Sequence, residues 1–389
     1  MNMTITCYKE LGEITIWDKK FNSVGNKYTN KVISTKHVSA EKLKSLENTG
    51  DIKLLSTGLF DGYTDCADTS IINDLEVITI PSGGTANIKY YNGKFIDSGN
   101  LLAVSSNPKL YNLKYIYYYL QKHISLIEWA FRGASIKHPQ MEDILSIKIP
   151  VCDITTQNQI VSILSELDNK IEQQNQIIDK FKKIKQSFLE LLFPQNTDIP
   201  QLRFNSFTDT WEQRKLSDIS KKISEKNTKS EISETFTNSA EYGIISQRDF
   251  FDRNITNAEN INTYYIVRNE DFVYNPRIST SAPCGPINRN RLNRTGVMSP
   301  LYTVFRTKNI DTLYLEWFFK TPHWYPYMYL NGDTGARSDR FSIKDETFFN
   351  MPIPFPNDEE QKKIGTFLET LDNLITLHQH KPFHLNFSL

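Results

Sequence analysis

The chain has 389 residues and carries 45 basic and 45 acidic side chains, so its formal net charge is zero. Hydrophobic residues make up 39% and charged residues 23%, which indicates a globular chain with room for two domains and excludes a disordered one. It has no apolar run long enough to span a membrane, its start lacks a signal-peptide pattern, and its four cysteines are scattered. We therefore expect a cytoplasmic protein with no membrane partner, no disulfide framework and no zinc site.

The chain contains an internal repeat. Pro150 corresponds to Pro354, and the offset is 354 − 150 = 204 positions. Without a gap, the match continues through Gln157 and Gln361, Ile160 and Ile364, Leu164 and Leu368, Leu167 and Leu371, Asp168 and Asp372, Asn169 and Asn373, and Ile171 and Ile375. This period is a whole domain plus a helix, so the repeat predicts two similar domains, each followed by a helix.

The match is weaker inside the two predicted domains. Residues 113–119 correspond to 313–319, and Gly133 corresponds to Gly335. Between these anchors the halves differ, and loops tolerate change that cores do not, so we expect two binding surfaces of different specificity. The predicted segments are a first domain 1–150, a central helix 151–194, a linker 195–210, a second domain 211–350, a shortened distal helix 351–381 and an irregular tail 382–389.

In the first domain, residues 77–96 contain no acid. They include the Gly-rich turn Ser82–Lys89, where the two glycines would let the backbone approach a phosphate closely. No Gly-Lys-Ser/Thr follows, so this turn is not a nucleotide-binding P-loop.

The aromatic runs 115–119 and 317–319 occupy matching positions in predicted helices, which favours core packing over base stacking.

The central helix is predicted from a stretch without Gly or Pro between about Thr155 and Phe193. Its length would be on the order of 58 Å, with Asp153 or the threonines after it as the cap and Pro194 as the stop. Apolar residues recur at spacings of four and three, as in a coiled coil, with two polar interruptions. A stripe of apolar side chains that is exposed to water is unfavourable, so we expect a partner helix to cover it. The residues assigned to this seam include Ile160, Leu164, Leu167, Ile171, Ile178 and Phe181.

The second domain contains no acid between Asp271 and Asp311, whereas it has six basic residues there. The distal helix then continues the seam with Ile364, Leu368, Leu371 and Ile375. Pro382 falls where the first copy has Ile178, so we expect this helix to end early. Two explanations stay open: a truncated tail, or completion of the seam by another subunit. We do not assign a metal site to His378, His380 and His384.

The repeated segments resemble the specificity subunit of type I restriction-modification enzymes. The likeness is carried by the Pro-x6-Gln-x-x-Ile segments that start at Pro150 and Pro354, by Glu359–Gln361 and by the run Asp209–Leu216. It implies an α+β fold, with two pseudo-repeated mixed α/β target-recognition domains separated by long coiled-coil-forming helices. Each domain would read one half of a split sequence in double-stranded DNA, and the helices would set the spacing.

The resemblance also implies that the chain has no catalytic activity. It would recruit two modification (methyltransferase) subunits and the restriction/translocase subunits of the complex. S-adenosylmethionine, ATP and Mg²⁺ are then expected in those partners, and no cofactor is expected in this chain.

Under this interpretation, polar residues of the divergent loops would contact DNA, since phosphate contacts supply affinity and base edges supply specificity. A solvated charge remains the alternative at each position. The candidates are Ser82, Gly83, Thr85, Lys89, Arg132, Ser135, Lys137 and His138 in the first domain, and Arg277, Ser279, Arg289, Asn290, Arg291, Arg294, Arg337 and Arg340 in the second.

Two other classes of function are alternatives to a DNA-recognition subunit: an enzyme that acts on DNA itself, and a coiled-coil adaptor. An adenine methyltransferase would need an Asn/Asp-Pro-Pro-Tyr/Phe motif, and Asn275-Pro-Arg-Ile278 lacks the second proline and the aromatic residue. No nuclease triplet stands out either. A coiled-coil adaptor that binds only proteins is disfavoured by the basic, loop-rich domains but is not excluded.

Overall fold

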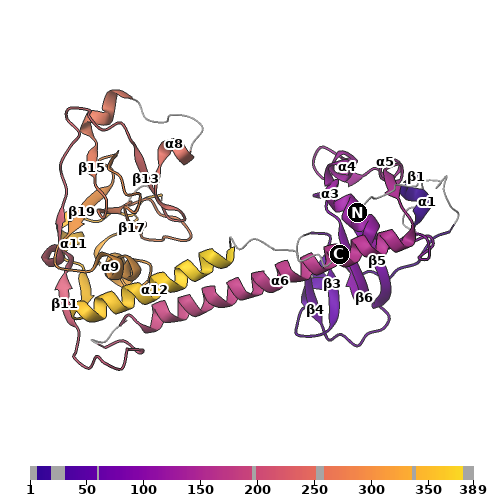
Figure 1. Ribbon diagram of the computed structural model, residues 1–389, viewed down its shortest axis with the longest axis horizontal. Coiled ribbons are helices and arrows are strands. Elements are labelled where there is room, and N and C mark those ends of the chain that lie inside the picture. Colours follow the sequence, from indigo (N-terminus) through magenta and orange to yellow (C-terminus); the bar gives the residue numbers. More distant parts are fainter. Residues whose placement is uncertain are drawn as a thin grey trace. The chain divides into compact units, whose positions relative to one another are not determined.

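The computed structural model describes residues 7–18, 31–58, 61–194, 199–250, 258–334 and 339–379. The chain divides into two compact units, Met1–Ile171 and Glu172–Leu389 (Figure 1). Helix α6 (Ile154–Leu191) begins in the first unit and ends in the second. The predicted central helix is therefore a single helix of 38 residues.

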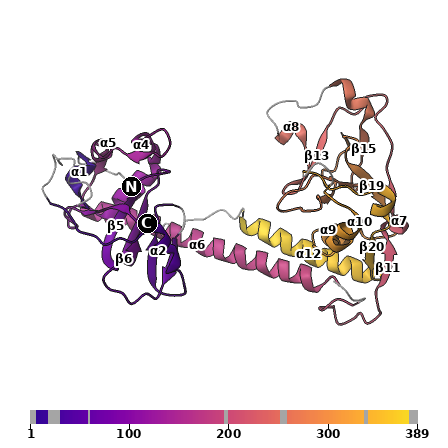
Figure 2. The same cartoon turned by 180° about the vertical axis from the view of Figure 1, so that it is seen from behind.

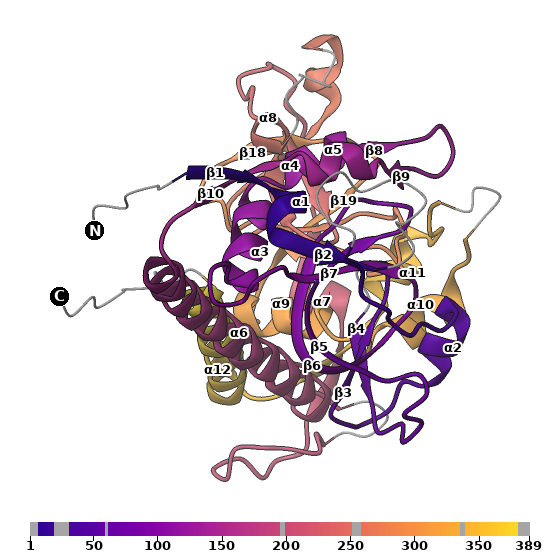
Figure 3. The same ribbon diagram turned by 90° about the vertical axis from the view of Figure 1, so that its right-hand side faces the viewer.

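The first unit is built around a six-stranded sheet in the order β2-β7-β5-β6-β3-β4, in which only β3 and β6 are parallel neighbours. Helix α3 packs against β5 (Figure 3), and Ile78 and Ala103 contribute to the core on this side. The elements are β1 (Cys7–Glu10), α1 (Leu11–Ile14), β2 (Thr15–Trp17), α2 (Ala40–Ser45), β3 (Ile52–Leu55), β4 (Asp61–Thr64), β5 (Asn73–Pro81), β6 (Lys89–Asp97), β7 (Asn100–Ser105), α3 (Leu113–Lys122), α4 (Ile124–Trp129), β8 (Phe131–Arg132), β9 (His138–Pro139), α5 (Met141–Leu145) and β10 (Lys148–Val151).

The second unit has a smaller sheet of four strands in the order β12-β19-β16-β17. Its core is rich in aromatic side chains, including Phe272 and Phe305, which stack on each other. The elements are β11 (Glu212–Lys215), α7 (Leu216–Ile219), β12 (Ser220–Lys222), β13 (Phe236–Ser239), β14 (Gly243–Ser246), α8 (Gln247–Phe250), the 3-10 helix η2 (Ala258–Thr263), β15 (Tyr265–Val267), β16 (Phe272–Tyr274), β17 (Ile287–Arg289), β18 (Gly296–Met298), β19 (Thr303–Thr307), α9 (Thr312–Phe319), α10 (Tyr325–Asn331), α11 (Asp345–Phe349), β20 (Pro352–Phe355) and α12 (Asp358–Gln379).

The sequence repeat is also a structural repeat. In the first unit β1 pairs antiparallel with β10, and in the second β11 pairs in the same way with β20. The hydroxyl of Tyr115 donates to the carbonyl oxygen of Pro150 at 2.9 Å, and that of Tyr314 donates to Pro354 at 2.8 Å. The structure thus corrects the sequence alignment of this helix by one residue, because Tyr115 is equivalent to Tyr314 and not to Leu315. The second domain continues to the end of β20 rather than ending at residue 350.

In the second unit, the last part of α6 runs antiparallel to α12. The contacts that show this are Gln174 with His378, Lys185 with Asp372, and the rings of Phe188 and Phe367. Figure 2 shows the two helices side by side, with α9 lying against α12. Of the seam residues here, Ile178, Ile364, Leu368 and Ile375 are buried, and Phe181 and Leu371 are partly buried.

The first part of α6 departs from the predicted seam. Ile160 packs into the core of the first unit, and Leu164 and Leu167 are partly buried. Ile171 is 43% exposed. The physical reason is that the domain itself covers this part of the helix: the hydroxyl of Tyr118 on α3 donates to the carboxylate of Asp168 at 2.6 Å. A helix partner is therefore found for only the second half of the seam within the described residues.

The predicted tail lies outside the described residues, as do Pro382, His380 and His384. Helix α12 is followed through Gln379 and is therefore shorter than α6 over its described length. No helix in the described ranges combines the length and the apolar character that a membrane crossing requires.

The pairing of α6 with α12 predicts a stability difference between two leucines of the same helix. Leu368 is fully buried and Leu377 is 63% exposed. We expect Leu368→Ala to lower the free energy of unfolding by about 2–5 kcal/mol, because it leaves a cavity. The matched variant Leu377→Ala should stay within about 0.5 kcal/mol of the unaltered chain in urea unfolding followed by circular dichroism. Equal losses would contradict the assigned register.

Candidate nucleic-acid interface

In the first unit, two of the predicted loops lie against each other. The turn after β5 meets the β8–β9 hairpin, where the backbone N–H of Gly84 donates to the carbonyl oxygen of Lys137 at 2.8 Å. The ring Nδ1 of His138 lies 2.9 Å from the carbonyl oxygen of Ser82. We call residues 82–86 and 132–138 the first two-loop surface. It brings together seven of the eight candidates of this domain: Ser82, Gly83, Thr85, Arg132, Ser135, Lys137 and His138.

The glycines of the turn have separate structural roles. A Cβ on Gly83 would lie 3.1 Å from the ring of His138, so the close contact between the loops favours glycine at this position. Gly84 has φ of +96°, a conformation that side-chain-bearing residues rarely adopt. The Gly-rich turn therefore allows both the loop contact and the local bend.

The second unit has the same arrangement at corresponding positions. The loop after β16 meets the segment that follows the undescribed residues 335–338. The backbone N–H of Ile278 donates to Asp339, and that of Phe341 donates to Pro276. We call residues 275–282 and 339–342 the second two-loop surface. It contains the candidates Arg277, Ser279 and Arg340, whereas Arg337 lies outside the described residues.

Two arginines meet on the second two-loop surface. Arg277 and Arg340 are neighbours through an antiparallel backbone bridge. Arg277 is exposed and Arg340 is partly exposed, and neither forms an ion pair with another described residue. Two such guanidinium groups on adjacent segments suit an anionic ligand, and each can also grip a guanine edge through two hydrogen bonds.

Buried amides hold the second two-loop surface beside a hairpin that the sequence did not indicate. Asn275 donates to the carbonyl oxygen of Asn238 at 2.8 Å, and Asn288 donates to the Asn238 side-chain oxygen at 2.6 Å. Asn238 lies at the β13–β14 hairpin, whose turn carries Tyr242, 57% exposed. The sequence feature that could have indicated this turn is Gly243, which follows Tyr242. Its φ of +70° is a conformation that favours glycine. An exposed tyrosine at this turn extends the polar surface.

Lys89 does not belong to the first two-loop surface. Its ammonium group donates to the carboxylate of Asp61 at 2.6 Å and to the carbonyl oxygen of Ser56 at 3.0 Å. The side chain is only 15% exposed. The prediction that Lys89 contacts DNA is therefore corrected. Its side chain joins β6 to the β3–β4 hairpin, because the fold brings Asp61 of β4 next to it.

The prediction that Arg289–Arg294 form a DNA-contacting cluster is also corrected for most of these residues. Arg289 is 10% exposed and donates to Glu316 and Glu270. Asn290 is fully buried and donates to two backbone carbonyl oxygens. These side chains have no access to a base edge. Arg294 pairs with Glu234 at 3.0 Å but keeps a side-chain exposure of 47%.

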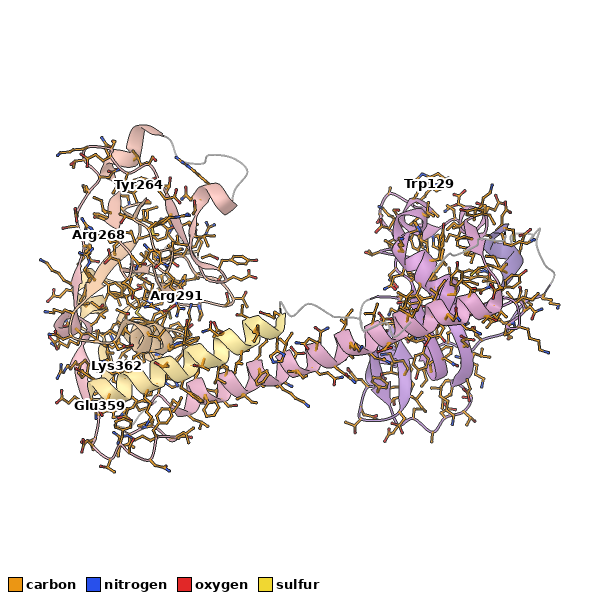
Figure 4. The ribbon with its side chains drawn as sticks, viewed as in Figure 1. Trp129, Tyr264, Arg268, Arg291, Glu359 and Lys362 are labelled. Atoms are coloured by element: carbon orange, nitrogen blue, oxygen red, sulfur yellow. The ribbon has the colours of Figure 1, made fainter. Side chains whose placement is uncertain are left out.

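Arg291, which is labelled in Figure 4, joins the second domain to its helix. It donates to Glu316 on α9 and, through both terminal nitrogens, to Glu369 on α12. Burial lowers the pKa of Arg291, but the hydrogen bonds to Glu369 and Glu316 outweigh it, so the pKa lies above its ordinary value. We call Arg289, Arg291, Glu316 and Glu369 the charged junction.

The first unit uses a matching helix position for the same purpose. Ser165 corresponds to Glu369, and both Ser165 and its neighbour Asp168 lie at hydrogen-bond distance from the hydroxyl of Tyr118. Burial, followed by the hydrogen bond to Asp168, raises the pKa of Tyr118 to about 12. Like any tyrosine hydroxyl, it is protonated at neutral pH, and it donates to Asp168. Each domain is thus tied to its helix by polar groups at equivalent positions.

No group of three or more His, Cys, Asp or Glu side chains within the described ranges is arranged to hold a metal ion. His378 contacts Gln174 and the ring of Phe181 in the helix pair. The ligand chemistry that the described surfaces offer is that of guanidinium, ammonium, hydroxyl and backbone N–H groups around two loops, with the exposed carboxylate of Asp339 beside Arg340.

Residues 9–183 and 208–386 match the family of type I restriction modification DNA specificity domains. The chain belongs to this family. It is 23% identical over 323 residues to the type I restriction enzyme MjaVIII specificity subunit of Methanocaldococcus jannaschii, which covers 79% of this chain and 74% of that protein. The fold is similar to that of the S subunit of a type I restriction-modification system from M. genitalium, with a TM-score of 0.62 at 14% identity over 97% of this chain and 92% of the other.

Membership of this family defines the role of the chain. It is a DNA-specificity subunit: it recognises a DNA target, and catalytic activity resides in other subunits. The two matched segments coincide with the two copies of the internal repeat. The expected α+β architecture of two recognition domains separated by a long helix is confirmed.

The charged junction predicts that Arg289 contributes to stability. Replacing it with methionine leaves Glu316 and Glu270 without this partner, and breaking such a buried pair costs about 3–5 kcal/mol. We expect Arg289→Met to lower the urea midpoint of the second unit, followed by tryptophan fluorescence, whereas Arg277→Met on the exposed loop leaves it unchanged. If both variants unfold like the original chain, the junction has been misassigned.

Proposed function

We propose that the two two-loop surfaces are the parts of this subunit that contact double-stranded DNA, and that each reads one half of a bipartite target. The observation that carries this proposal is the repeated construction. In the first unit, the turn after β5 contacts the β8–β9 hairpin, which follows α4. In the second unit, the loop after β16 contacts residues 339–342, which follow α10 in the chain. The scaffold is the same, and the side chains that it displays differ.

The difference in side chains supports unlike half-sites. The first two-loop surface offers hydroxyl groups, Lys137 and His138, together with a Gly-rich backbone. The second offers Arg277 and Arg340, which suit phosphates and guanine. Backbone and cationic groups supply affinity, and side chains at base edges supply sequence selection.

For the assembled complex, we infer two modification (methyltransferase) subunits and further restriction/translocase subunits as partners. The repeat supports this number, because matching helix–domain junctions offer a partner two similar surfaces. S-adenosylmethionine, ATP and Mg²⁺ would be bound by those partners, because methylation and translocation would take place there. The complex would work in the cytoplasm, where its DNA target lies.

Neutralising one phosphate contact should change the salt dependence of binding. In the complex with its modification subunits, we expect Arg277→Met to weaken binding to a duplex that carries the target found by methylome sequencing. The slope of log K against log salt should fall by about 0.9 if Arg277 contacts one phosphate. Arg214→Met, on the same unit but over the ring of Phe355, should leave this slope unchanged in fluorescence anisotropy. A common slope for both variants would refute the assignment.

Exchange of one domain should change one half of the target. Because the second domain runs from β11 through β20, we would replace residues 211–355 by the same segment of another family member. Methylome sequencing should then show a new second half-site, while the first half-site is retained. A change in both halves would show that the domains do not read DNA independently.

A further inference from the structure

A cleft of about 490 Å³ opens within the first unit at the edge of the first two-loop surface. It lies between the turn after β5 and the β8–β9 hairpin, and the end of α4 closes one side. Trp129, the last residue of α4 and the neighbour of Glu128 in the chain, is labelled in Figure 4. The residues that line the cleft are Gly84, Thr85, Ala86, Glu128, Phe131, Ser135, Ile136 and Lys137.

Glu128 is the one acidic residue in this lining. It is exposed, and it forms no ion pair or side-chain hydrogen bond with another described residue. The carboxylate of Asp143 nearby is different, because it accepts a hydrogen bond from Arg132 at 2.7 Å. Glu128 therefore retains its full capacity to accept hydrogen bonds from a ligand.

An unpaired carboxylate is unfavourable on a surface that faces the phosphates of DNA, because like charges repel. It becomes favourable where it accepts a hydrogen bond from the nucleic acid. In the major groove, the base-edge donors are the exocyclic amino groups, N4 of cytosine and N6 of adenine. The other walls suit a base edge as well, since Phe131 and Ile136 are apolar and Ser135 and Thr85 carry hydroxyl groups.

We propose that Glu128 is a specificity-determining residue, whose carboxylate accepts a hydrogen bond from the exocyclic amino group of a cytosine or adenine in the first half-site. This inference rests on the proposed function, in which the first two-loop surface faces DNA. Glu128 reads the base edge, and the neighbouring loops hold the backbone of the same strand.

The second unit has a different side chain at the matching position. The alignment that pairs Gly133 with Gly335 places Leu330 opposite Glu128. Leu330 is 85% exposed, and its hydrocarbon side chain has no atom that could accept a hydrogen bond. The two units therefore present different chemistry from the same place in the repeat, as readers of unlike half-sites must.

The test is Glu128→Met in the complex with its modification subunits. Methionine keeps the approximate size of the side chain and removes both the charge and the carboxylate acceptors, whereas the amide oxygen of glutamine would still accept from an amino group. Methylome sequencing should show that one cytosine or adenine of the first half-site is no longer required, while the second half-site is unchanged. In competition binding, discrimination against a duplex with another base at that position should fall about tenfold.

A base analogue identifies the contact itself. Replacing that adenine by purine, or that cytosine by 2-pyrimidinone, deletes the amino group, so this replacement should weaken binding of the unaltered complex but not of the Glu128→Met complex. The matched control is Glu142→Met, an exposed carboxylate on α5 outside the cleft lining, which should retain the original target. Equal thermal unfolding of both variants shows that the domain is intact.

Two results would overturn the inference. An unchanged target with unchanged discrimination means that Glu128 reads no base. A uniform rise in affinity for every duplex means that the carboxylate merely repels phosphates. If the unaltered complex recognises no split target at all, the proposed function is overturned as well, and this outcome is distinct from the other two.

Discussion

A buried glutamine at the start of each long helix attaches the recognition domain to that helix. The side chain of Gln157 accepts a hydrogen bond from the backbone N–H of Asn112 and donates to two backbone carbonyl oxygens. Gln361 accepts from Asp311 in the same way. Rotation of the domain would leave these buried groups unpaired, at a cost of about 1–3 kcal/mol for each group. The orientation of the loops on each domain, and of each domain on its own helix, follows from this constraint.

Beyond this shared attachment, the two units use different chemistry at equivalent positions. The first relies on the hydroxyl of Tyr118, which donates to Asp168, and the second relies on the charged junction around Arg291. A neutral hydrogen bond and a set of partly buried ion pairs achieve the same geometry. The scaffold therefore tolerates exchange of its contacts as well as of its loops, provided that buried polar groups remain paired.

The distribution of charge explains which side chains remain available for DNA. A stretch without acids is not a basic surface, because the fold brings acids from elsewhere to it. Glu316 and Glu369 are distant in sequence from Arg289 and Arg291, yet they neutralise both. Arg277, on an exposed loop, has no such partner among the described residues. The cationic part of the interface is thus smaller and more localised than the run of arginines indicates.

The sequence by itself determined the repeat, the long helix, the two domains and the family. These depend on local periodicity and on matched segments such as those that begin at Pro150 and Pro354, which can be read without distances. It also predicted that the loops around Gly83 and Arg277 form the interface. The correspondence between the loops at Gly133 and Gly335 was accessible because the same anchors recur in both halves.

Only the tertiary structure decided which individual residues of those loops face outward. Asn290 and Lys89 were indistinguishable in sequence from exposed polar residues, yet one is enclosed and the other is bound to an acid of a distant strand. Conversely, no sequence pattern indicates that Glu128 is a binding residue. Its place in the lining of a cleft depends on the β8–β9 hairpin, which is folded against the same end of α4. Exposure and ion pairing depend on contacts between residues far apart in the chain, and no local pattern encodes them.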